Sequence, residues 1–214
     1  MTESNEIWLA SYPRSGNTLL RTILWQCFGL PSGSVYPQDF KGNQALADYV
    51  GHIERGPNNE TAFPAGSYPM MKTHEHSKDD NRAIYVIRDG RAVIVSLWKF
   101  YRGEISIDAL IDGDPRFGTW SGHVRSWNPW ERPGTLLLRY EDMTDDLPGV
   151  LKKISDILGR EILKDSIPDR ESIAAVDGRY VRPRADRTPE LSDDQLDRFI
   201  EINGDTLMRA GYLD

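Results

Sequence analysis

Short apolar runs alternate along the chain with longer segments in which apolar residues recur at helical spacing. A strand buried on both faces of a parallel sheet appears as a short continuous apolar run, whereas a surface helix keeps one apolar stripe. Alternation of the two predicts an α/β fold in which helices flank a mostly parallel central sheet. The predicted strands are Ile7–Ala10, Pro69–Lys72, Ala83–Ile87 and Thr135–Arg139.

The segments with helical spacing carry start and stop signals. Gly29 and Pro31 end the first, and Gly159 ends the fourth. Ser192 is followed three residues later by Gln195, a capping box that marks the start of the last. The predicted helices are Thr18–Phe28, Ala92–Tyr101, Gly118–Trp127, Leu147–Leu158 and one that runs from Ser192 towards Met208.

Two stretches interrupt this alternation. Pro31–Tyr68 is rich in Gly, Pro and Asn, and Asp165–Pro189 holds several arginines among prolines and acidic residues. Both compositions predict loops over the sheet edge, and no internal repeat is evident. A length of 214 residues suits one domain with its own core. We therefore predict a single domain over residues 1–214.

The chain is acidic, with a net charge of −7 and a pI near 5.2, which argues against a nucleic-acid partner. Any anionic ligand must therefore be met by locally clustered arginines. Met1–Glu6 lacks a signal-peptide pattern, and no apolar run approaches the ~20 residues of a membrane span. The single Cys27 permits no internal disulfide, which is typical of a reducing compartment. We expect a cytoplasmic protein without a membrane partner.

A tight turn joins the first predicted strand to the first predicted helix. Its sequence, Tyr12–Thr18, brings backbone N–H groups at a helix start together with two hydroxyls and the Arg14 cation. This combination favours binding of a phosphate-like anion. A nucleoside-triphosphate loop, GxxxxGK[ST], needs a lysine directly after its second glycine, and here Asn17 follows the glycine. ATP is therefore not the first candidate ligand, and a capped helix start without a ligand is the alternative interpretation.

A second candidate anion site follows the strand Ala83–Ile87. Arg88 leaves the carboxyl end of this strand, where open α/β sheets bind ligands. Ser96 lies two turns into the helix that comes next. A guanidinium and a hydroxyl can share one phosphate there, while an exposed arginine and a surface serine are the alternative.

A candidate base and cation follow the apolar run Pro69–Met71, at the end of a predicted strand. Lys72 and His74 are two residues apart, so both side chains point the same way off the strand end. Imidazole titrates near pH 6.5 and can take a proton at neutral pH. His74 is therefore the candidate general base, with His76 as its rival.

These motifs resemble, in the same order, those of the sulfotransferases that use 3′-phosphoadenosine 5′-phosphosulfate (PAPS). The turn is similar to the family's Tyr-Pro-Lys-Ser-Gly-Thr-Thr-Trp, with Arg14 in place of the lysine and Leu19 in place of the tryptophan. Tyr85–Ser96 is similar to Tyr-Val-x-Arg-Asn-Pro-x-Asp-Val-x-Val-Ser. Gly118–Trp127 and Leu138–Met143 resemble the family's Gly-Ser-Trp-x-x-His-Val-x-x-Trp helix and Tyr-Glu-Asp-Met strand end. The resemblance implies a P-loop-NTPase-like sulfotransferase fold.

The resemblance also implies how the donor is bound. The turn would hold the 5′-phosphosulfate, Arg88 and Ser96 the 3′-phosphate, and Tyr140 would lie against the adenine. The family's C-terminal Arg-Lys-Gly-x-x-Gly-Asp-Trp motif is missing, and three arginines that lie in roughly its place are candidate substitutes: Arg182, Arg184 and Arg187. The donor-binding residues implied in the first two motifs and at the strand end are Arg14, Ser15, Gly16, Asn17, Thr18, Leu19, Arg88, Ser96 and Tyr140.

In the same comparison Lys72 contacts the donor and His74 is the general base towards the acceptor. Arg14 joins Lys72 in meeting the charge that develops as the S–O bond breaks. His123 would line the acceptor pocket. Independently of the resemblance, three aromatic residues favour a planar or apolar acceptor if they face inwards, although core packing is the alternative for each: Trp98, Tyr101 and Phe117.

The function implied is transfer of a sulfuryl group from PAPS to a hydroxyl or amine of a small molecule, without a metal. A metal-dependent kinase or nucleotide hydrolase is the first alternative, and it lacks the Walker lysine. A non-catalytic nucleotide-binding relative is the second, and the presence of both Lys72 and His74 argues against it. The identity of the acceptor and the oligomeric state stay open.

Overall fold

The computed structural model describes residues 6–39, 49–63, 69–169 and 191–213. Six strands form one sheet in the order β3-β2-β4-β1-β5-β6, and each neighbouring pair is parallel. The predicted parallel sheet is therefore confirmed. The strands are β1 (Ile7–Ser11), β2 (Ser32–Ser34), β3 (Val50–His52), β4 (Met70–Thr73), β5 (Arg82–Ile87) and β6 (Thr135–Arg139).

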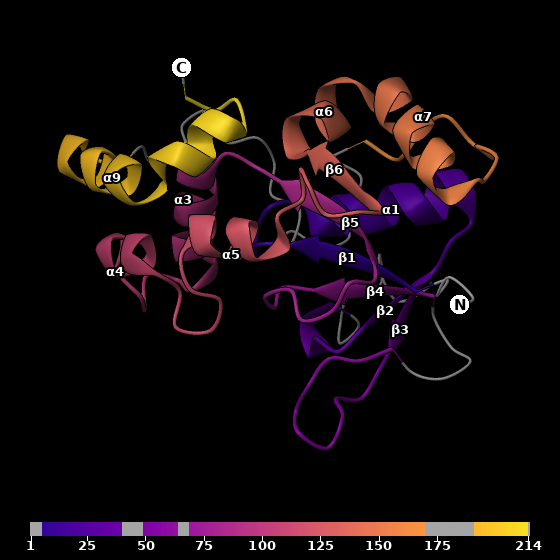
Figure 1. Ribbon diagram of the computed structural model, residues 1–214, viewed down its shortest axis with the longest axis horizontal. Helices are drawn as coiled ribbons and strands as arrows, with labels where there is room; N and C mark the ends of the chain where they lie inside the picture. The colour runs from indigo at the N-terminus through magenta and orange to yellow at the C-terminus, as the bar shows by residue number, and fades with distance from the viewer. Residues whose placement is uncertain (1–5, 40–48, 64–68, 170–190, 214) are drawn as a thin grey trace.

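Helices lie on both faces of this sheet, as Figure 1 shows, with α6 and α7 at the upper right and α3, α4, α5 and α9 at the left. The described helices are α1 (Asn17–Phe28), α3 (Gly90–Phe100), α4 (Ile107–Asp112), α5 (Trp120–Trp127), α6 (Tyr140–Asp145), α7 (Leu147–Leu158) and α9 (Asp193–Arg209), with a short 3₁₀ turn, η1 (Pro37–Asp39).

The strands bury side chains on both faces because alternate residues point to opposite sides. In β1, Leu9 packs with α1 and α7, whereas Trp8 packs with the layer formed by α3, α5 and α9. In β5, Ile84 and Tyr85 divide between the two layers in the same way. This double burial explains why the central strands are continuously apolar.

The register of the sheet brings the carboxyl ends of neighbouring strands to one edge. Ala10 of β1 pairs with Thr73 of β4, and Ser11 pairs with Val86 of β5. Segments far apart in the sequence therefore leave the sheet side by side. In open α/β sheets ligands bind outside the carboxyl ends of the strands, so this edge is the place to look for a site.

Most predicted elements lie within two residues of the observed ones, and the capping box of Ser192 and Gln195 is formed. The prediction of a loop throughout Pro31–Tyr68 is wrong, because β2 and β3 extend the sheet there. Each has three residues, and β2 reads Ser-Gly-Ser, so neither shows an apolar run. Helices α4 and α6 were not predicted for a similar reason, since six residues are too few to show a helical period.

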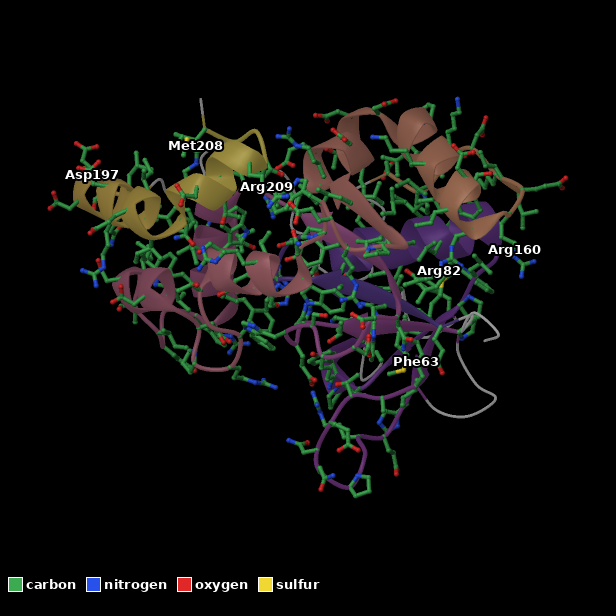
Figure 2. The ribbon with its side chains drawn as sticks, in the orientation of Figure 1. Phe63, Arg82, Arg160, Asp197, Met208 and Arg209 are labelled. Carbon is green, nitrogen blue, oxygen red and sulfur yellow. The ribbon has the colours of Figure 1, made fainter. Side chains whose placement is uncertain are left out.

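Figure 2 labels Phe63 and Arg82, whose side chains contact neighbouring parts of the fold. Phe63 packs on Trp8 with ring centroids 4.3 Å apart, and Arg82 at the start of β5 donates to the carbonyl oxygen of Ile157 in α7. Within the described residues, no helix combines the length and the apolar character that crossing a bilayer requires.

Candidate active site

The turn between β1 and α1 presents uncapped backbone donors. Gly16, the N-cap residue of α1, has φ 109° and no side chain, and no side-chain cap bond is formed at this end of the helix. The N–H groups of a first helical turn have no partner within the helix. The Oγ of Ser15 is buried and has no hydrogen-bond partner in the described structure. Donors without partners at a helix N-terminus form a site for an anion.

Two arginines enclose this turn. Arg14 adopts φ 70°, which is costly for a residue with a side chain, and its Nε donates to Ser96 Oγ at 3.3 Å. Arg88, from the end of β5, donates through Nη1 to the carbonyl oxygen of Arg14 at 3.2 Å. Its guanidinium also lies over the Tyr140 ring, 4.3 Å from the centroid. The two predicted anion motifs therefore form one continuous basic site.

Gly16 is necessary for the close approach of Tyr140. A Cβ at this position would lie 2.5 Å from Tyr140 Cδ2, closer than such atoms come in proteins. Tyr140 is the first residue of α6, directly after β6. The ring predicted to meet the adenine therefore lies directly against the anion turn.

The His74 ring is held next to this turn in one tautomer. Its Nδ1 lies 2.8 Å from the carbonyl oxygen of Ser11, the last residue of β1. A carbonyl only accepts, so Nδ1 carries the proton and Nε2 keeps its lone pair. Burial, followed by the charge of Lys72, holds the pKa of His74 well below its ordinary value. The ring is therefore neutral at neutral pH, with Nε2 as the basic atom.

The peptide groups of His74 are held as firmly as its ring. Its N–H donates to the hydroxyl of Tyr36 at 3.1 Å, and its carbonyl oxygen lies 3.1 Å from His123 Nε2. The Phe117 ring meets the His74 ring edge-on, with centroids 5.9 Å apart. Contacts from separate elements thus fix the candidate base.

His123 does not occupy the position that the resemblance implied. Its side chain is fully buried, Nε2 faces the His74 carbonyl oxygen and Nδ1 lies 2.9 Å from the Tyr85 hydroxyl. Burial, followed by the charge of His76, lowers the pKa of His123 to about 3. Because both ring nitrogens are bonded inside the protein, the ring has no atom to offer an acceptor in this structure.

The rival base His76 is exposed. Its Nε2 lies 3.0 Å from the carbonyl oxygen of Phe117, so this nitrogen carries a proton and is not a free base. His74 is favoured because its ring is held by Ser11 next to the anion turn, whereas the ring of His76 is held by Phe117.

Lys72 lies in a buried cluster that the sequence did not reveal. Its Nζ is 3.0 Å from both carboxylate oxygens of Asp39, which also accepts from Arg21 Nη1 at 3.0 Å and from Ser34 Oγ at 2.5 Å. Burial would raise the pKa of the Asp39 carboxyl, but the charges of Arg21 and Lys72 and the hydroxyl of Ser34 hold it well below its usual range. Burial is also the main cause that lowers the pKa of Lys72, to about 8.

Two residues of the implied donor site have side chains turned away from it. Asn17 Nδ2 donates to the Leu9 carbonyl oxygen at 2.8 Å and to Ser11 Oγ at 3.3 Å, so the buried side chain is bonded to β1. Leu19 packs against the core layer beneath α1. Only the backbone N–H groups of these two residues are directed to the helix start. Thr18 is half-buried in the same first turn.

The aromatic candidates for the acceptor side are distributed unequally. Phe117 touches His74, whereas the Tyr101 hydroxyl donates to Asp114 at 2.7 Å and Trp98 packs at the rim of the main core. Phe100, which the sequence analysis did not single out, is half-exposed, and the Arg14 guanidinium lies over its ring, 5.3 Å from the centroid. Its spacing of four residues from Ser96 on α3 was the signal that could have found it.

Other members of the site were missed because the partner of a single polar residue leaves no periodic pattern in the sequence. These are Ser11, Arg21, Tyr36, Asp39 and Tyr85. Arg182, Arg184 and Arg187 lie outside the described residues. Among the described residues no group of three or more His, Cys, Asp or Glu side chains is placed to hold a metal ion.

Comparison with known proteins identifies the family of the chain. The family profile described as "Sulfotransferase domain" matches residues 4–174. Mouse Sulfotransferase 2A6 is 34% identical over 229 residues, which cover 99% of this chain and 77% of the relative. Mouse Sulfotransferase 2A2 is 33% identical over 78% of this chain and 64% of its own length, and rat Sulfotransferase 1A1 is 23% identical over 76% and 62%. The chain thus spans less than two thirds of the length of the last two.

Solved structures share the fold. Mouse sulfotransferase SULT7A1 complexed with PAP superposes with a TM-score of 0.62 and 18% identity, over 94% of this chain and 83% of that one. Retinol dehydratase in complex with androsterone and the inactive cofactor PAP gives 0.59 at 18% identity, over 97% and 82%.

Proposed function

The chain belongs to the sulfotransferase family, and from this we propose that it transfers a sulfuryl group from PAPS to a hydroxyl or amine of a small-molecule acceptor, with His74 as general base. One observation carries the proposal. A neutral imidazole, whose Nε2 has no hydrogen-bond partner among the described residues, is fixed beside the uncapped turn at the carboxyl edge of the sheet.

The residues of the turn fit the donor. The uncapped start of α1 and the partnerless Ser15 hydroxyl supply donors for the 5′-phosphosulfate, together with the Arg14 cation. Arg88 and Ser96 supply a guanidinium and a hydroxyl for the 3′-phosphate. Both lie within hydrogen-bond distance of Arg14, so the two candidate phosphate sites are adjacent.

The adenine is assigned to Tyr140, whose ring is stacked under Arg88 next to Gly16. A guanidinium over an aromatic face leaves the opposite face of the ring for a planar base. With Leu19 packed in the core in place of an aromatic wall, this ring carries more of the contact with the base.

The protein contributes binding, orientation and proton transfer. The donor supplies the sulfuryl group and leaves as adenosine 3′,5′-bisphosphate (PAP). His74 Nε2 accepts the proton of the attacking acceptor group, while its protonated Nδ1 stays bonded to Ser11. Arg14 and Lys72 offset the negative charge that remains on the donor oxygen. The lowered pKa of His74 keeps the base unprotonated before the reaction, and anionic donor groups nearby raise it as the proton arrives.

The acceptor is assigned to the side of His74 where Phe117 lies. Phe117 favours a flat or apolar molecule that carries the nucleophile. Retinol dehydratase, which shares this fold, forms complexes with androsterone and with retinol, and both are apolar alcohols of this kind.

The test is a calorimetric titration of the purified protein with PAP, with Mg-ATP as the control for a kinase or hydrolase. PAP binding without a response to Mg-ATP is the expected result, followed by transfer of radioactive sulfate from PAPS to a panel of phenols and apolar alcohols. A preference for Mg-ATP, or no response to PAP, would contradict the proposal.

A further inference from the structure

The buried cluster around Asp39 joins four elements that are separate in the sequence. Arg21 comes from α1, Lys72 from β4 and Asp39 from η1, with Ser34 at the end of β2. The side chains of Arg21 and Asp39 have no exposed surface, and that of Lys72 is 8% exposed. Two cations share one carboxylate here, so the cluster carries a net positive charge.

A buried ion cluster is expensive, because each charge loses its hydration. Arg21 is particularly poorly satisfied, since its Nε and Nη2 have no hydrogen-bond partner within the described structure. Stability alone does not favour this arrangement, because apolar side chains of similar volume are often as stable or more so. A cluster retained at this cost and located beside the candidate base points to a functional role.

The hydrogen bonds of Lys72 leave it ready to contact a ligand. An ammonium group has three N–H bonds, and the Asp39 carboxylate, whose two oxygens both lie 3.0 Å from Nζ, takes at most two of them. The Tyr36 ring lies against the same ammonium, 4.7 Å from ring centroid to Nζ. The described residues give the third N–H no hydrogen-bond acceptor. The carboxylate thus fixes the direction of the side chain without using all of its donors.

The charges around Lys72 act in opposite directions. Asp39 favours the charged ammonium, whereas burial and the cations of Arg21 and Arg14 favour the neutral amine. His74, two residues along the strand end, is neutral and leaves this balance unchanged. Asp39 is therefore the group that keeps Lys72 positively charged at neutral pH.

We propose that Asp39 is a positioning residue for the transfer reaction: held by Arg21 and Ser34, it clamps the Lys72 ammonium in place and keeps it charged, with one N–H directed to the donor. This inference rests on the proposed function, because it requires Lys72 to contact the donor. It adds a carboxylate that touches neither donor nor acceptor, and it explains why a buried arginine lies behind the site. The clamp is electrostatic, so it acts on the rate more than on nucleotide affinity.

Opposite substitutions test the clamp. Asp39→Asn removes the charge that favours the ammonium, and Arg21→Gln removes a charge that disfavours it. The measurement is kcat/KM for PAPS against pH, which reports the ionisations of the free enzyme. We expect the high-pH limb of the profile to move to lower pH by about one pH unit or more in Asp39→Asn and to higher pH in Arg21→Gln. In Asp39→Asn the loss of kcat/KM is then about fivefold at pH ~8, approaches about tenfold at higher pH, and is smaller near pH 6.

A second readout does not depend on activity. The pKa of Lys72 is followed in the ligand-free protein by NMR of lysines labelled at Cε, with Lys72→Gln identifying its signal. Asp79→Asn is the matched control, because Asp79 also pairs with an arginine, Arg132, but lies outside the site. This control lowers thermal stability without moving either the NMR pKa or the rate profile.

The outcomes separate the inference from the function on which it rests. The clamp is supported if the high-pH limb and the NMR pKa of Lys72 both move to lower pH in Asp39→Asn and to higher pH in Arg21→Gln. Displacements in the same direction, or an Asp39→Asn loss that is equal at every pH, would overturn it even if the wild-type protein binds PAP and transfers sulfate. Absence of PAP binding in the wild type would instead defeat the proposed function, whatever the variants do. If Asp39→Asn does not fold, Arg21→Gln alone still tests the inference, because the clamp requires its high-pH limb to move to higher pH.

Discussion

His123 Nε2 lies 3.1 Å from the carbonyl oxygen of His74, so one buried histidine supports the backbone of another. Because the carbonyl accepts, Nε2 of His123 carries the proton, and Nδ1 accepts from the Tyr85 hydroxyl at 2.9 Å. The chain of bonds connects β5 through α5 to the residue that follows β4. It holds the candidate base through its backbone carbonyl.

Replacement of His123 by Leu is expected to lower kcat about tenfold or more, because the His74 carbonyl and the Tyr85 hydroxyl both lose a partner, at about 1–3 kcal/mol each. His123→Gln keeps an amide N–H that can reach the carbonyl and should recover much of kcat. The checks are steady-state kinetics and PAP titration, with affinity for PAP unchanged in both. A fall in PAP affinity equal to the fall in kcat would show general damage to the fold.

His74→Ala is expected to abolish transfer and to leave PAP binding largely intact, because the ring acts on the acceptor and is bonded to Ser11 of β1, which precedes the anion turn. Single-turnover transfer and calorimetry with PAP measure the two effects separately. His76→Ala is the matched control and should retain most of the activity. Retained turnover in His74→Ala would exclude the ring as the base.

Arg88→Ala is expected to weaken PAP binding about thirtyfold, which corresponds to about 2 kcal/mol for a charged group left without its phosphate partner. Arg88 also orders the turn through the Arg14 carbonyl oxygen, so kcat should fall as well. Calorimetry gives the affinity. Arg198→Ala, which breaks an exposed ion pair between α9 and Asp112 of α4, serves as the control and should bind PAP normally.

The pH profile of the wild-type protein follows from two lowered pKa values. The pKa of His74 lies well below its ordinary value, so kcat/KM should not fall as pH decreases through about 6.5. Lys72 must stay charged, and burial lowers its pKa to about 8, so kcat/KM should fall as pH rises through that value. Measurement of kcat/KM for PAPS from mildly acidic to alkaline pH checks both limbs. A rising limb near 6.5 would show that His74 titrates normally.

Gly16→Ala is expected to reduce both stability and PAP binding. An alanine there is strained at φ 109°, and its Cβ would lie 2.5 Å from the Tyr140 ring. Gly159→Ala separates the backbone strain from the steric clash, because Gly159 has φ 61° with nothing within 4 Å of the added Cβ. Thermal melting should show a loss of about 1 kcal/mol for Gly159→Ala and a larger loss for Gly16→Ala. Equal melting temperatures would mean that the Tyr140 ring yields without cost.

The sequence by itself determined the central sheet and the order of its motifs. Strands buried on both faces must be apolar along their length, so β1, β4, β5 and β6 are visible as runs. Ligand-binding turns follow such strands at their carboxyl ends, so the positions of Arg14, Lys72, His74 and Arg88 directly after predicted strands were enough to place all four at one edge of the sheet.

Only the tertiary structure decided which partners these residues have. Asp39 meets Lys72 because β2 and η1 come next to β4, although the two residues are 33 positions apart. His123 was expected to face an acceptor, and the packing of α5 against β5 turns it onto the His74 backbone instead. A periodic pattern indicates which face of an element is buried. The contact between two single polar residues depends instead on how distant elements pack, so it cannot be predicted from the sequence around either residue.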